Sequence, residues 1–152
     1  MWCCQWMKKI QWKKVLMAGL AYVVIAFVVH QVEAMLTMDY YIMPEYFSVW
    51  SKVMMLRAGP PPMSFMIISL VFSYVTGVTL AAVYDFVKGL LPKKFWPKVI
   101  NFSDLIIGLM VVFFTLPVYL LLNVPLGLLL AWLFSSVIIV VLGTMVFVKV
   151  LE

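Results

Sequence analysis

The feature that most constrains this chain is a run of 44 residues, 105–148, that contains no charged side chain. As one helix this run would be about 66 Å long at ~1.5 Å per residue, roughly twice the ~30 Å hydrocarbon core of a bilayer. The run must therefore fold back on itself, and the tripeptide NVP at 123–125 has the turn chemistry to do so. The sequence predicts two membrane-spanning helices here, over about residues 104–122 and 125–150, and Pro117 should kink the first.

Two earlier segments are also long and apolar enough to cross a bilayer, over about residues 15–36 and 63–84. Of the 152 residues, 66% are hydrophobic and only 11% are charged, which is more apolar surface than a soluble domain of this size could bury. We therefore expect one membrane domain over residues 1–152. Its fold class is an all-α integral membrane protein with four transmembrane helices in a compact bundle.

The two longer connections carry residues suited to the membrane interface. Residues 38–62 should form an outer loop with a short amphipathic helix that starts near Pro44 and lies in the interface. A second, cytoplasmic loop is expected over residues 85–103. The predicted interfacial anchors are three aromatic residues in these loops, Tyr46, Trp50 and Trp96.

Small residues recur at four-residue spacing along two of the predicted helices. Such a stripe lets a second helix approach closely, so we expect close packing of these two helices against each other or against other chains. The helix over residues 63–84 is the expected hub of the bundle. The stripe residues are Ser69, Ser73, Gly77 and Ala81 in that helix, and Gly127, Ala131, Ser135 and Gly143 in the last.

The basic residues are distributed unequally between the two sides that four crossings would create. Nine lysines fall on the side of the termini and two basic residues on the other, which by the positive-inside rule predicts cytoplasmic termini in a prokaryotic inner membrane. We therefore attribute the net charge of +5 to lysines that set the orientation of the chain and contact anionic lipid headgroups, and not to a nucleic-acid-binding surface. The nine are Lys8, Lys9, Lys13, Lys14, Lys88, Lys93, Lys94, Lys98 and Lys149, and the two are Lys52 and Arg57.

Ionisable residues near the end of the first predicted helix are candidates for a polar or proton site. His30 and Glu33 are three apart and share a helix face, and Asp39 follows closely. A structural or solvated role is the alternative, because the residues sit near a helix end where water or a basic neighbour could satisfy them.

Motifs for enzymatic chemistry are missing from the sequence. It shows no phosphate-binding glycine loop, no Ser-His-Asp set and no Cys-x-x-Cys motif, and Cys3 and Cys4 have no metal-ligand spacing. We expect no enzyme activity, no metal and no cofactor. Haem or a pigment held by His30, the only histidine, is a less favoured alternative.

The layout resembles small four-helix inner-membrane proteins of prokaryotes, a resemblance that implies no activity. The expected function is a non-catalytic accessory or scaffold subunit of a larger membrane complex, in contact with lipid and with other membrane subunits or copies of itself. The alternative is a small transporter or proton-coupled carrier that uses His30 and Glu33.

Overall fold

The computed structural model describes residues 10–51, 53–54 and 61–152, and this part of the chain is helical with short connections. Four helical spans within it are long and apolar enough to cross a membrane, which is consistent with a multi-pass membrane protein. The elements are α1 (Trp12–Ile42), η1 (Pro44–Val49), α2 (Met63–Val87), η2 (Lys88–Leu90), α3 (Phe95–Met110), η3 (Val111–Thr115), α4 (Leu116–Leu121) and α5 (Leu126–Leu151).

The predicted spans lie within these helices, with some differences at their ends. The first helix continues beyond residue 36 to Ile42 and so includes Asp39. The third span begins at Phe95, so the last part of the predicted loop 85–103 is helical. In the predicted interfacial helix the described chain forms a six-residue 3-10 helix, η1, and residues 52 and 55–60 of that loop lie outside the described part. The amphipathic helix therefore stays a prediction.

The third span is a composite of three helical pieces, α3, η3 and α4. Its middle piece, η3, is a π-helical turn that ends at Thr115, two residues before Pro117. Proline has no N–H to donate and its ring crowds the carbonyl four residues earlier, so the backbone widens just before it. The predicted disturbance at Pro117 thus takes the form of a π-turn.

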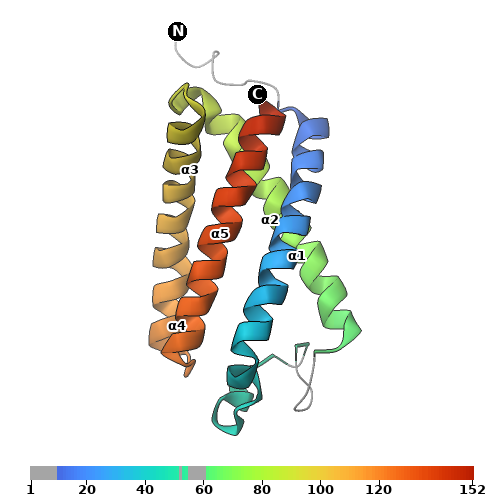
Figure 1. The fold of residues 1–152 in the computed structure, drawn as a ribbon, viewed down its shortest axis with the longest axis vertical. Coiled ribbons are helices and arrows are strands. Elements are labelled where there is room, and N and C mark those ends of the chain that lie inside the picture. The colour runs from blue at the N-terminus through green and yellow to red at the C-terminus, as the bar shows by residue number, and fades with distance from the viewer. Residues whose placement is uncertain (1–9, 52, 55–60) are drawn as a thin grey trace.

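The helix at the centre of the bundle is α1, not α2 as the small-residue stripe had suggested. α1 packs along both α2 and α5, α3 packs on α5, and α2 meets α5 only briefly. Figure 1 shows α2 crossing behind α1 and α5, with its Met63 end on the opposite side of the bundle from α4. We name the two ends of the bundle by their connections: the α2–α3 end, where α5 also finishes, and the α4–α5 end, where α1 finishes.

The core explains why α1 is central. Tyr22 of α1 is buried between Gly77 of α2 and Gly143 of α5. A Cβ atom placed on Gly77 would lie 2.8 Å from the Tyr22 Cβ, and one on Gly143 would lie 2.7 Å from its Cδ2. The stripes of α2 and α5 therefore pack against an aromatic side chain of α1 rather than directly against each other.

Candidate functional site

The loop-end cluster

A polar and aromatic cluster lies at the α4–α5 end, and its central group is the Glu33 carboxylate. We call the set His30, Glu33, Thr37, Tyr41, Trp50 and Trp132 the loop-end cluster. Glu33, Thr37 and Tyr41 are four residues apart on α1, so one buried face of that helix presents all three. Trp132 comes from α5, and Trp50 from the chain just after η1.

Glu33 is only 8% exposed and lies among hydroxyl groups. The Thr37 Oγ1 atom is 2.8 Å from Glu33 Oε1 and also 2.8 Å from the Glu33 backbone oxygen. The Tyr41 hydroxyl donates to Glu33 Oε1 across 3.3 Å. These contacts bring two hydroxyl groups to one oxygen of the carboxyl group, and no basic side chain in the described part of the chain is bonded to it directly.

The two tryptophans of the cluster pack around Tyr41, the residue whose hydroxyl donates to this carboxyl group. The Trp132 indole N–H donates to the Tyr41 hydroxyl at 2.7 Å, and the Trp50 indole N–H donates to the Tyr41 backbone oxygen at 3.1 Å. The Tyr41 ring centroid is 5.1 Å from that of Trp50 and 6.5 Å from that of Trp132. The three rings pack on one another and form a cap.

Of the three residues predicted as a polar site, the structure brings two together. The His30 Nδ1 atom lies 4.0 Å from Glu33 Oε2, but the His30 side chain is 53% exposed and sits at the rim of the cluster. Asp39 is exposed, and it is six positions from Glu33, which places it on a different face of α1. The polar site therefore centres on Glu33, with His30 as its exposed neighbour.

Sequence reasoning did not identify Thr37, Tyr41 or Trp132 as site residues. The four-residue spacing from Glu33 to Thr37 and Tyr41 was a usable signal for two of them. Trp132 is 91 positions from its partner Tyr41, and no local pattern reports such a contact.

The polar network at the α2–α3 end

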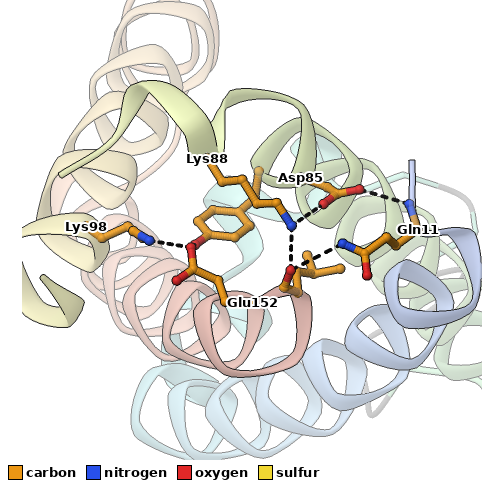
Figure 2. Close-up of polar contacts among 7 residues, drawn as sticks. Gln11, Asp85, Lys88, Lys98 and Glu152 are labelled. Atoms are coloured by element: carbon orange, nitrogen blue, oxygen red, sulfur yellow. Dashed lines mark hydrogen bonds and ion pairs between the residues drawn. The ribbon is translucent and has the colours of Figure 1, made fainter. Parts of the chain in front are cut away.

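A second group of polar residues ties the four spans together at the α2–α3 end (Figure 2). We call it the clasp. Its side chains come from the start of α1, the end of α2, the first turn of α3 and the end of α5. The clasp consists of Gln11, Tyr84, Asp85, Lys88, Lys98, Glu152 and the backbone oxygen of Leu151.

One half of the clasp centres on Lys88. Its ammonium is 2.7 Å from Asp85 Oδ1 and also donates to the Leu151 backbone oxygen. The other oxygen of Asp85 accepts the backbone N–H of Gln11 at 2.9 Å. This half joins the start of α1 and the end of α5 to α2.

The other half centres on Glu152. Its carboxylate accepts hydrogen bonds from Lys98 and from the Tyr84 hydroxyl, the latter at 3.0 Å. Burial alone would raise the pKa of Glu152, but the hydrogen bonds from Lys98 and Tyr84 and the charges of Lys98 and Lys88 outweigh it and lower that pKa. The two lysines and two carboxylates of the clasp balance in charge.

An open hollow of about 340 Å³ adjoins the clasp, lined by Gln11, Lys88, Gly89, Leu151 and Glu152. Among the residues that the structure describes, no group of three or more His, Cys, Asp or Glu side chains could hold a metal ion. The clasp groups bond mainly to one another, so the arrangement is suited to fastening helix ends.

The predicted packing residues of α2 differ in how deeply they are buried. Gly77 and Ala81 are buried, whereas Ser69 and Ser73 are half-buried. On α5, Ser135 and Gly143 are buried, and Gly127 faces Tyr40, whose hydroxyl would lie 2.6 Å from an added Cβ. Ala131 is half-buried.

The predicted interfacial anchors have different surroundings. Trp96 is exposed on the first turn of α3 and Tyr46 is half-buried in η1. Trp50 is half-buried within the loop-end cluster. Their contact with a bilayer interface stays a prediction.

Comparison with known proteins does not assign the chain to a family. No protein-family model matches the chain, no curated protein is significantly similar to it, and no solved structure matches its fold.

Proposed function

We propose that this protein is a non-catalytic, multi-pass membrane protein that serves as an accessory or scaffold subunit of a larger membrane assembly. The observation that supports this most is the change of burial along α2. That helix is described over its whole length, and its four buried residues, Gly77, Ala81, Tyr84 and Asp85, all lie in the half toward the α2–α3 end.

The row of small residues on α2 continues past the four buried residues toward Met63. Ser69 and Ser73 extend the stripe by two more turns into residues 63–76, where this chain buries no side chain completely. Small residues at this spacing let another helix approach closely in lipid, where van der Waals packing and interhelical hydrogen bonds drive association. A helix of another subunit is the occupant that we propose for this face.

The interior of the bundle supports a scaffold role. Tyr22 stacks on Phe147 with centroids 6.1 Å apart, and Tyr84 meets both Phe147 and Phe102 at 6.4 and 5.3 Å. These rings belong to one buried apolar cluster to which α1, α2, α3 and α5 each contribute. A bundle packed in this way can hold a partner in a fixed geometry.

Site-specific photo-crosslinking tests the proposal directly. A photoreactive residue at position 69 or 73 should give a discrete adduct with one membrane protein in native membranes. The matched control is position 72, because Phe72 is 67% exposed one residue away, on another face of the same helix. Equal labelling at 69, 72 and 73, with lipid adducts only, would contradict the proposed interface.

The buried carboxyl group of Glu33 favours a second candidate, a small transporter or proton-coupled carrier. Ionisable groups inside membrane helices often mark ion or proton pathways. Under this alternative, H30L/E33L removes proton flux into dye-loaded proteoliposomes while E45Q, at an exposed residue of η1, keeps it. Under the accessory function, H30L/E33L leaves assembly with the partner nearly intact.

We propose, from the lysine distribution, a cell (inner) membrane location with both termini in the cytoplasm. The clasp and the α2–α3 connection would then face the cytoplasm, and η1 would face outward.

A further inference from the structure

Glu33 is a carboxyl group within a membrane-spanning helix that has little charge around it. Its own helix contributes His30 at 4.0 Å and the Tyr41 hydroxyl. α5 contributes the indole N–H of Trp132 through Tyr41, and residues 126–148 of α5 are uncharged. Residues 63–83 of α2 are also uncharged, and Glu45 of η1 is exposed. Within the described chain, His30 is thus the one group near Glu33 that can become a cation.

The hydrogen-bond geometry around Glu33 requires more hydrogens than its neighbours supply. Three oxygen–oxygen contacts meet here: Thr37 to the Glu33 backbone oxygen and to Oε1, both at 2.8 Å, and Tyr41 to Oε1 at 3.3 Å. The Trp132 N–H can only donate, so the Tyr41 oxygen accepts from it and the Tyr41 hydrogen points to Glu33. Thr37 and Tyr41 then provide one hydrogen each for three contacts.

A proton on Glu33 resolves this shortfall. The carboxylic acid donates from Oε1 to the Thr37 oxygen, and Thr37 donates its own hydrogen to the Glu33 backbone oxygen four residues earlier. Tyr41 continues to donate to Oε1. The neutral acid is therefore the protonation state that gives each contact its own hydrogen, and it also avoids burying a negative charge without a bonded cation.

We propose that Glu33 is a reversible proton-binding site within the membrane, in which Thr37 and Tyr41 hold the carboxylic acid and His30 exchanges the proton with water. This inference goes beyond the accessory function and does not depend on it. It deepens the second candidate function, because a proton-coupled carrier needs such a site.

The exchange step is a simple proton transfer. The carboxyl group first turns so that its protonated oxygen takes the place of Oε2, the oxygen that faces His30. The Glu33 acid then gives this proton to Nδ1 of neutral His30, leaving a carboxylate and an imidazolium, and the half-exposed imidazolium releases a proton from Nε2 to water. The 4.0 Å separation is longer than a hydrogen bond. One bridging water or a small rotation of the exposed ring would complete the path.

Infrared spectroscopy tests the site, with the full chain in nanodiscs of ether-linked phosphatidylethanolamine and phosphatidylglycerol, lipids that have no ester carbonyl. The stretching band of a carboxylic acid C=O is separate from carboxylate bands, and exposed carboxyls are ionised well above their ordinary pKa of about 4. At about pH 7 the wild-type protein should still show this band, E33Q should lose it, and E45Q should keep it. T37V should shift its frequency, because the acid loses its acceptor.

Transfer into D₂O tests the role of His30. The band should shift as the proton exchanges for deuterium, and H30A should slow that exchange by about tenfold or more, since a positioned base is removed. Absence of the band in the wild-type protein, or its persistence in E33Q, would overturn the proposal. Unchanged exchange in H30A would overturn the assigned route. None of these outcomes bears on whether the protein co-purifies with a partner, so the two proposals can fail separately.

Discussion

Tyr22 is the residue on which the packing of three helices depends. Its ring fills the space above Gly77 and Gly143, and it is almost completely buried. Neither glycine has a positive φ, so what they supply is room for the ring rather than an unusual backbone conformation. Because α2 and α5 clamp the ring from two sides, it cannot move away from an added side chain.

Substitution of Gly77 by leucine should destabilise the protein by about 1–3 kcal/mol through overpacking against Tyr22. Gly143→Leu should act in the same direction. The control is Gly108→Leu in α3, where an added Cβ meets nothing within 4 Å, and its effect should stay within about 1 kcal/mol. Thermal unfolding of the purified variants in detergent measures the difference, and equal stability of G77L and G108L would contradict the assigned role of Tyr22.

Loss of one charge from the Lys98–Glu152 pair should have unequal effects. Lys98 is 7% exposed and Glu152 is 37% exposed, so E152Q leaves a buried ammonium without its counter-charge, whereas K98M leaves a carboxylate that water can reach. E152Q should therefore destabilise more than K98M. The loss should be smaller than the ~3–5 kcal/mol of a fully buried pair, because Glu152 is partly solvated. A larger effect of K98M on the melting temperature would contradict this reasoning.

The same pair predicts a dependence on pH. The pKa of Glu152 is lowered in the folded state, so its contribution to stability is present above its unfolded pKa and is lost as pH falls through the folded value. The melting temperatures of wild type and E152Q should therefore converge as pH falls from neutral to below about 4. A difference that stays constant over this range would show that the charge of Glu152 does not stabilise the fold.

At the scale of elements, Pro117 accounts for the π-turn in the third span. P117A restores a backbone donor and removes the ring that crowds residue 113, so η3 should convert to α-helix. Amide hydrogens of residues 111–118 should then exchange more slowly with solvent. P125A, before α5, is the matched control and should leave these rates unchanged. A π-turn that persists in P117A would mean that packing of Thr115 on its neighbours, rather than the proline, causes it.

The spans could be predicted from sequence because each is a long apolar run with few or no charged residues. Turn-forming or charged residues mark the ends of these runs. Which helix lies at the centre could not be predicted in the same way. The stripe of small residues on α2 indicated that another helix packs closely against it. That helix proved to be α1, because its Tyr22 fits between Gly77 of α2 and Gly143 of α5, two glycines 66 positions apart. Local periodicity identifies a packing face and contains no information about its partner.

The polar residues at the two ends of the bundle could also be predicted only in part. Glu33 stood out because a carboxylate in an apolar run is costly, and His30 was its neighbour at helical spacing. The clasp was not predicted, since Asp85, Lys88 and Lys98 looked like ordinary interfacial charges, and their partners at residues 11, 151 and 152 are distant in sequence. Polar residues at helix ends are common, so composition did not distinguish a fastened network from solvated charges.

At the scale of the whole molecule, the two ends of the bundle differ in chemistry. The α2–α3 end is fastened by ion pairs, and the α4–α5 end by aromatic rings around one carboxyl group. The lysine distribution predicts that the first end faces the cytoplasm.

Cysteine labelling tests this orientation. In a background with Cys3 and Cys4 replaced by serine, a cysteine at exposed residue 45 should react with a membrane-impermeant maleimide added outside intact cells. A cysteine at exposed Gly89 should react only after the membrane is opened. The reverse pattern would place the termini outside.

If this bundle functions within a larger assembly, that assembly should survive gentle extraction, and its size can then be measured. The protein is extracted from native membranes in mild detergent, and the mass and composition of whatever co-migrates are measured. We expect a reproducible complex that contains other membrane subunits and that is lost when Ser69 and Ser73 are replaced by phenylalanine. A lone monomer or a small homo-oligomer in the wild-type extract would contradict it.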